Sequence, residues 1–231
     1  MPDKIELDNV THSYGAIPVL RKVSLKIERG ESVQIGGRSG SGKSTLLEIC
    51  AGLIMPHSGT VSWDGLSLRN MQKQELYKAR RHMGYVFQVN ALISNHSVFD
   101  NIALPLRTRR NISEKDITRK VRDQMELLGL FNIDNLFPES LSVGQLKTVA
   151  IARALIVEPD ILLLDEPLSG LDPQAVQGVV NVLQEYRIKK ETTIIMINNE
   201  KSVPEQYPSR MLLLNSGKLE NASDTAHQEI E

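Results

Sequence analysis

The chain contains 231 residues, enough for one compact, subdivided domain with a full hydrophobic core. Its 27 Lys and Arg residues nearly balance 28 Asp and Glu residues, and a net charge of -1 provides no field that would attract nucleic acid or an anionic membrane. Cys50 is the only cysteine, which excludes an intrachain disulfide and a zinc site built from several thiolates and favours a reducing compartment such as the cytoplasm.

The first 50 residues predict antiparallel strands followed by a strand, a loop and a helix. Apolar and polar residues alternate imperfectly over residues 5–7 and 19–27, as in strands with one buried face. A short apolar strand expected at 32–35 leads into a glycine-rich loop. Residues 43–51 then suit a helix that Gly52 ends.

A helical pattern replaces this arrangement between residues 89 and 157. Apolar side chains recur there on one helical face, at Ile117, Val121, Met125 and Leu128. Ser113 and Asp116 resemble a capping box at the start of this run, and Gly129 ends it. We therefore expect a helical insertion at this point of the chain.

The remaining pattern predicts a parallel sheet covered by helices. Apolar strands expected at 161–164 and 192–197 flank a helical stretch at 173–186, and 211–214 resembles the last core strand. No apolar run is long enough to span a bilayer, and the first residues lack the apolar region of a secretory signal. Any membrane contact would therefore require another chain.

A phosphate-binding loop is the strongest functional signal. The P-loop pattern lies between the expected strand and helix, as this motif requires. Its residues are Gly37, Arg38, Ser39, Gly40, Ser41, Gly42, Lys43 and Ser44, followed by Thr45. The glycines let backbone N–H groups surround phosphate oxygens, Lys43 reaches the β and γ phosphates, and Ser44 offers its hydroxyl to Mg²⁺. A flexible glycine loop with a chance lysine is the alternative.

An acidic pair follows the apolar strand at 161–164. A buried strand of an open α/β sheet delivers such residues to its carboxyl end, where ligands bind. Asp165 would hold Mg²⁺ through water, and Glu166 would polarise the attacking water as general base. The alternative is an ordinary acidic turn before Pro167.

The run Leu141-Ser142-Val143-Gly144-Gln145 resembles the signature of the ABC transporter ATPase family, and the order of motifs along essentially the whole chain is similar. The resemblance implies a P-loop NTPase (RecA-like) α/β core with an antiparallel β subdomain and an inserted helical signature subdomain. It also implies that Ser142, Gly144 and Gln145 of one protomer face the ATP bound by the other. A helix cap built from small residues is the alternative.

The resemblance divides the chain as one ABC ATPase domain over residues 1–231. Its core would comprise 1–88 and 158–220, its helical insertion 89–157, and its polar tail 221–231.

Three further positions match the family one at a time. Tyr14 stands where an aromatic ring stacks on adenine, although a hairpin tyrosine can also pack on its own strand. Gln88 resembles the glutamine that senses Mg²⁺ and the attacking water, with an ordinary strand-end polar residue as the alternative. Asp172 would touch the partner protomer, and a helix cap before Pro173 explains it equally simply.

Two departures from the family pattern predict slow turnover. Asn199 occupies the position of the usual switch histidine and can donate an amide N–H to the γ phosphate, but it cannot become cationic. Loss of one such donor costs about 10²- to 10³-fold in rate. Val143 replaces a glycine of the signature and restricts the backbone there. The alternatives are an ATP-binding regulatory module and one half of a heterodimer.

The resemblance also sets expectations about partners and cargo. It implies a second ABC ATPase protomer, for which we favour a homodimer, and a transmembrane permease subunit that docks near residues 88–106. The alternative is that the apolar residues of this segment, Leu92, Ile93, Val98 and Phe99, pack the core of the insertion itself. The chain would lie in the cytoplasm, peripheral on the inner face of the cell membrane, and bind no nucleic acid. Segments 87–106 and 136–140 look like those of Mla/MCE-type lipid transporters, which favours a lipid cargo.

Overall fold

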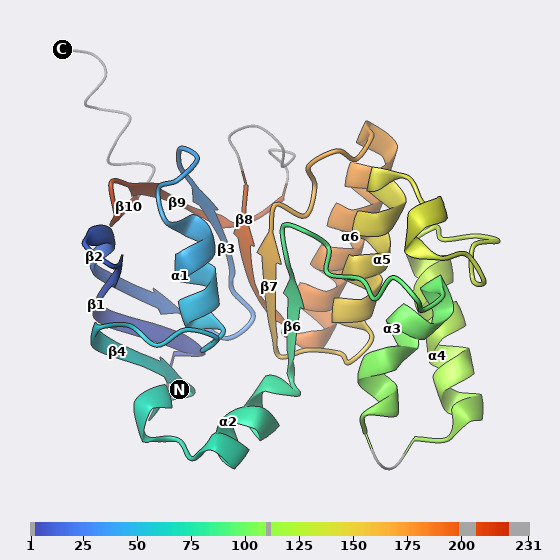
Figure 1. The fold of residues 1–231 in the computed structure, drawn as a ribbon, viewed down its shortest axis with the longest axis horizontal. Coiled ribbons are helices and arrows are strands. Elements are labelled where there is room, and N and C mark those ends of the chain that lie inside the picture. The colour runs from blue at the N-terminus through green and yellow to red at the C-terminus, as the bar shows by residue number, and fades with distance from the viewer. Residues whose placement is uncertain (1–2, 110–111, 199–206, 222–231) are drawn as a thin grey trace.

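Two sheets and six α-helices form the computed structural model, which describes residues 3–109, 112–198 and 207–221 (Figure 1). The antiparallel sheet has the order β2-β1-β4-β5. Its strands are β1 (Ile5–Tyr14), β2 (Ile17–Ile27), β4 (Ser58–Trp63) and β5 (Leu66–Ser67). Alternating burial along β1 and β2 shows one face turned to the core, which is why the sequence alternates there.

The second sheet is parallel except at one edge. Its order is β10-β9-β3-β8-β7-β6, and only β10 pairs antiparallel with its neighbour. The strands are β3 (Ser32–Gly36), β6 (Met83–Val86), β7 (Ile161–Asp165), β8 (Thr193–Ile197), β9 (Arg210–Asn215) and β10 (Lys218–Asn221). Every residue of β3, β7 and β8 is buried, as expected for strands covered on both faces.

Three connected hydrophobic clusters hold the elements together. The first joins both sheets through α1 (Lys43–Cys50). The second packs α5 (Val143–Leu155) and α6 (Pro173–Lys190) on β7 and β8. The third joins α3 (Val98–Arg107) and α4 (Glu114–Leu127) to the other side of α5, on the flank of the molecule away from the antiparallel sheet (Figure 1).

The predicted α/β fold is confirmed, with a parallel sheet and an antiparallel one. The strand expected at 192–197 begins one residue later, and the helix expected at 43–51 ends one residue earlier. Sequence patterns did not predict β4, β5, the 3₁₀ turns at Leu68–Asn70 and Pro138–Ser140, or the short helix α2 (Lys73–Arg80). They also missed β10, which follows the strand expected to be the last one and pairs with it. No residue of α2 is fully buried, and only Leu76 and Ala79 pack against the core, so its apolar pattern is too short to predict a helix.

Candidate nucleotide-binding site

A pocket of about 290 Å³ lies at the carboxyl ends of β3 and β7. Its lining residues are Tyr14, Val19, Ser39, Gly40, Gly42, Lys43, Ser44, Thr45, Gln88, Asp165 and Glu166. The structure therefore brings together, from four separate segments, the P-loop, the acidic pair, the predicted aromatic and the predicted glutamine. Because β3 and β7 both flank β8, their following segments meet at one edge of the sheet.

The P-loop follows β3 in a path that glycine makes possible. Gly37 has a φ of 139° and Gly42, just before α1, a φ of 101°. A Cβ on Gly37 would lie 2.3 Å from the Leu214 carbonyl oxygen, and one on Gly42 would lie 2.8 Å from Val19 Cγ1. The loop is thus closed against β9 and β2 by contacts that leave no room for a side chain.

Lys43 lies folded back over this loop. Its side chain is buried, and its ammonium donates to the Gly37 carbonyl at 2.6 Å and to the Arg38 carbonyl at 3.0 Å. The Ser41 hydroxyl is also buried and has no hydrogen-bond partner. A cation held by neutral carbonyls and an unpaired buried hydroxyl are polar groups that suit a bound anion.

Asp165 and Ser44 form the part of the site that suits a magnesium ion. The two side chains are hydrogen-bonded, and burial raises the pKa of Asp165 while Ser44 and the charge of Lys43 oppose that rise. Burial, with the nearby Asp165 charge, also raises the pKa of Glu48. A carboxylate and a hydroxyl in contact are hard oxygen ligands, which Mg²⁺ prefers, so these residues fit the ion.

Glu166 follows directly in a left-handed backbone conformation, with a φ of 49°. Its N–H donates to the Ile197 carbonyl at 3.0 Å, which fixes the residue at the end of β7. Non-glycine residues occupy this region rarely, and they cluster at functional sites.

The predicted signature lies outside the pocket and forms a helix cap within this protomer. Ser142 Oγ accepts from the Gln145 N–H at 3.2 Å, and Gln145 Oε1 accepts from the Ser142 N–H at 2.9 Å. A Cβ on Gly144 would lie 3.5 Å from Leu171 Cδ2. Asp172 caps α6 by accepting from the Ala175 N–H at 2.9 Å. Within one protomer these residues therefore cap α5 and α6, and such caps are compatible with contacts to a nucleotide on a second protomer.

The structure bears differently on two other predictions, the role of Asn199 and the docking surface at residues 88–106. Asn199 lies outside the residues that the structure describes. Val98 is buried, and Leu92 and Phe99 pack against the same cluster of α3, α4 and α5, which agrees with the alternative that these side chains form the core of the insertion.

Lys147 was not among the site residues predicted from the sequence, although the run Leu146-Lys147-Thr148 departs from the usual polar residues after the family's signature. This residue of α5 is buried beside Glu166, and burial lowers its pKa while the charges of Glu166 and Asp165 oppose that change. A further signal is that this lysine lies on a helix with mostly apolar residues after it.

An arginine-lined groove of about 370 Å³ runs between β6 and α3. Arg80, Arg81, Arg109 and Arg153 line it together with apolar residues that include Phe87, Leu104 and Pro105. Arg109 and Arg153 donate to backbone carbonyls of Arg81 and Ala91 at 2.9 and 2.8 Å. Among the described residues, no carboxylate forms an ion pair with these four arginines.

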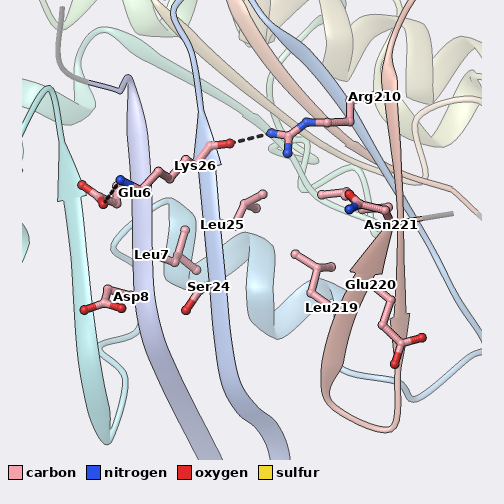
Figure 2. Close-up of a pocket in the computed structure, with 11 residues that line it drawn as sticks. Glu6, Leu7, Asp8, Ser24, Leu25, Lys26, Arg210, Leu219, Glu220 and Asn221 are labelled. Carbon is pink, nitrogen blue, oxygen red and sulfur yellow. Dashed lines mark hydrogen bonds and ion pairs between the residues drawn. The ribbon is translucent and has the colours of Figure 1, made fainter. Parts of the chain in front are cut away.

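A separate depression of about 350 Å³ lies between the antiparallel sheet and the β9–β10 hairpin (Figure 2). Its two basic side chains are paired within the fold. Lys26 pairs with Glu6 at 2.9 Å, and Arg210 pairs with Glu31 at 2.7 Å and donates to the Lys26 carbonyl. Asp8 and Glu220 also line the depression and form no ion pair among the described residues.

A glycine-rich loop between a buried strand and a helix, facing an acidic pair at the end of β7, two strands away in the same sheet, defines a P-loop nucleotide-binding protein. Residues 20–169 match the family described as ABC transporter, and the chain belongs to this family. The cofactors expected from the sequence, ATP and Mg²⁺, are those of the family.

Curated relatives match nearly the whole chain. A methionine import ATP-binding protein of Clostridioides difficile is 36% identical, covering 96% of this chain and 68% of the relative. A sulfate/thiosulfate import ATP-binding protein of Mesostigma viride is 38% identical, covering 94% of this chain and 60% of the relative. The chain thus spans only about two thirds of their length.

Solved structures agree with the fold. A bacterial ABC transporter cassette, solved as a dimer, superposes with a TM-score of 0.88 and 34% identity, covering 94% of this chain and 97% of that one. The same cassette in a post-hydrolysis state, bound to ADP and phosphate, superposes with a TM-score of 0.88 and 32% sequence identity. No helix in the described part of the chain is both long and apolar enough to cross a membrane.

Proposed function

We propose that this chain binds and hydrolyses ATP as the motor subunit of a membrane transporter. The observation that carries the proposal is the meeting of Lys43, Ser44, Asp165 and Glu166 in one pocket, with the Ser44 hydroxyl hydrogen-bonded to Asp165. These groups supply a phosphate-binding cation, oxygen ligands for a metal and a carboxylate that can accept a proton.

Each residue has a distinct part in the proposed reaction. Lys43 would exchange its two carbonyl contacts for phosphate oxygens, and Ser44 with Asp165 would hold Mg²⁺, whose charge stabilises the phosphates when it is bound. Glu166 would accept a proton from the attacking water, and Gln88 would orient that water. Tyr14, which is exposed at the pocket rim, would stack on the base.

A second protomer would complete the site. Ser142, Gly144 and Gln145 lie outside the pocket of their own chain, and Val143 is 63% exposed at the start of α5. A helix N-terminus on the surface can bind an anion presented by another molecule. The dimeric cassette among the similar structures supports this arrangement, and we favour a homodimer.

The permease would dock on the arginine-lined groove between β6 and α3. In this proposal the segment 89–157 acts as the arm that connects the permease to the ATP site, because Gln88 leaves β6 beside the groove and reaches the pocket. The chain would then be peripheral on the inner face of the membrane.

The cargo has two candidates. Segments 87–106 and 136–140 favour a lipid, whereas the relatives named for methionine and sulfate import favour a small solute. Reconstitution with the cognate permease separates them, since phospholipid, methionine or sulfate would selectively stimulate ATP hydrolysis.

Hydrolysis itself is tested with Glu166→Gln. We expect phosphate release to fall at least about 100-fold, because a general base contributes about 10²- to 10⁴-fold. ATP binding should persist, and light scattering should detect an ATP-dependent dimer. Glu126→Gln, a matched change on the exposed face of α4, should leave both properties unchanged. Equal activity in the wild type and Glu166→Gln would refute the role of Glu166.

A further inference from the structure

A buried lysine joins the signature helix to the acidic pair of its own protomer. Lys147 lies on α5, five positions after Ser142, and is only 4% exposed. Its ammonium donates to the Glu166 carbonyl at 2.5 Å and to Ser169 Oγ. Both hydrogen bonds of this ammonium are therefore made to the segment that follows β7.

These contacts help to fix the backbone of Glu166. Its φ of 49° is a conformation that non-glycine residues adopt rarely and that needs support from its surroundings. The N–H is held by Ile197, and the carbonyl accepts from Lys147 and, at 3.1 Å, from Ser169 Oγ. Lys147 is the only one of these supports that comes from α5.

A lysine is a costly choice for this position if only packing matters. An ammonium buried without full solvation destabilises the fold unless it is hydrogen-bonded, and an apolar side chain of similar length would avoid that cost. Thr148, the next residue, shows the usual solution for a polar group on this helix, since its hydroxyl donates to the Gly144 carbonyl of the same helix at 3.0 Å.

We propose that Lys147 is a positioning residue that transmits the position of the signature to Glu166. A helix moves as a rigid rod over one or two turns, and Lys147 lies about 7.5 Å along α5 from Ser142. When a nucleotide on the partner protomer engages Ser142, α5 shifts, and Lys147 carries that shift to the carbonyl of Glu166. Each site thereby senses occupancy of the other. This inference rests on the proposed function.

The test compares four variants with the wild type. Lys147→Met keeps the approximate length of the side chain and removes its charge and hydrogen-bond donors, while Lys147→Arg keeps the charge and the donors. Ser169→Ala removes the second partner of the ammonium, and Lys115→Met is a control on the exposed face of α4. Steady-state hydrolysis gives kcat, KM and the Hill coefficient for ATP, and thermal melting checks that each variant folds.

We expect Lys147→Met to lower kcat by about tenfold or more, equivalent to about 1.4 kcal/mol. KM should stay within about twofold, and the Hill coefficient should fall towards 1. Lys147→Arg should recover part of kcat, Ser169→Ala should show a smaller loss, and Lys115→Met should match the wild type. A purely packing role predicts the opposite order, with Lys147→Met active and Lys147→Arg impaired, and that order would overturn the proposal.

Hydrogen exchange provides a readout that does not depend on hydrolysis. In the nucleotide-free protein, Lys147→Met should accelerate exchange of the Glu166 and Ser169 amides, while Lys147→Arg should not. An inactive wild type would refute the proposed function alone. Unchanged exchange at these amides in Lys147→Met would refute the Lys147 proposal whether or not the protein hydrolyses ATP.

Discussion

Gly84 marks the place where β6 and α5 touch most closely, and it provides a direct test of how the helices sit on the sheet. A Cβ on Gly84 would lie 2.6 Å from the Ala154 carbonyl oxygen of α5 and 2.8 Å from Leu162 Cδ1 of β7. The first of these atoms is backbone, so Gly84→Ala can be accommodated only if α5 moves. Overpacking of this kind costs about 1–3 kcal/mol.

The expected result is a lower melting temperature. For a domain of this size, 1 kcal/mol corresponds to about 2–4 °C, so Gly84→Ala should lower the midpoint by about 2–12 °C in differential scanning calorimetry. The φ of Gly84 is not positive, so the loss would be steric and would owe nothing to backbone strain.

Gly178→Ala is the matched control. Gly178 lies in the exposed interior of α6, where an added Cβ meets nothing within 4 Å. Alanine in a helix interior is favoured over glycine by about 0.5–1 kcal/mol, so this variant should melt about 1–4 °C higher than the wild type. A Gly84→Ala midpoint equal to the wild type, with Gly178→Ala raised as expected, would show that α5 does not pack this closely on β6.

Three further predictions follow from single side chains. Burial raises the pKa of Cys50 to about 12, so the thiol stays protonated in the folded state. The free energy of unfolding should therefore be constant below a pH of about 8.5 and fall as the pH rises above it. Urea titrations from pH 7 to 10 check this, and Cys50→Ala should remove the trend. Tyr186→Phe removes a buried hydroxyl that donates to Gln124 Oε1 at 2.9 Å, and unfolding in urea should show a loss of about 1–3 kcal/mol, whereas an unchanged midpoint would contradict this bond between α6 and α4. Val143→Gly should raise kcat for ATP if the isopropyl group restricts the signature, with a stability cost of about 0.5–1 kcal/mol at the start of α5. A kcat equal to or below that of the wild type would refute the prediction that Val143 limits turnover.

The sequence by itself determined the nature of the nucleotide site. The P-loop is one contiguous segment. Its glycines, lysine and serine are the residue types that phosphate binding requires, and a single loop brings them all to the phosphates. The same holds for Asp165 and Glu166, because a short, fully apolar strand can only be a buried one and its carboxyl end has a defined position in an α/β sheet. Local patterns of this kind predict a binding site without knowledge of the rest of the fold.

Tertiary structure alone decided which distant residues meet. Tyr14, at the end of β1, and Gln88, just after β6, line the same pocket although they belong to different sheets, and no local pattern predicts that they meet. Val98 shares its apolar character with surface residues, and only the packing of α3 against α4 and α5 shows that it is buried. Lys147 has no motif at all, and its closeness to Glu166 arises from the packing of α5 beside the segment after β7. The physical reason is the same in each case: chemical type and spacing fix local conformation, whereas contacts between segments far apart in the chain depend on how whole helices and sheets pack.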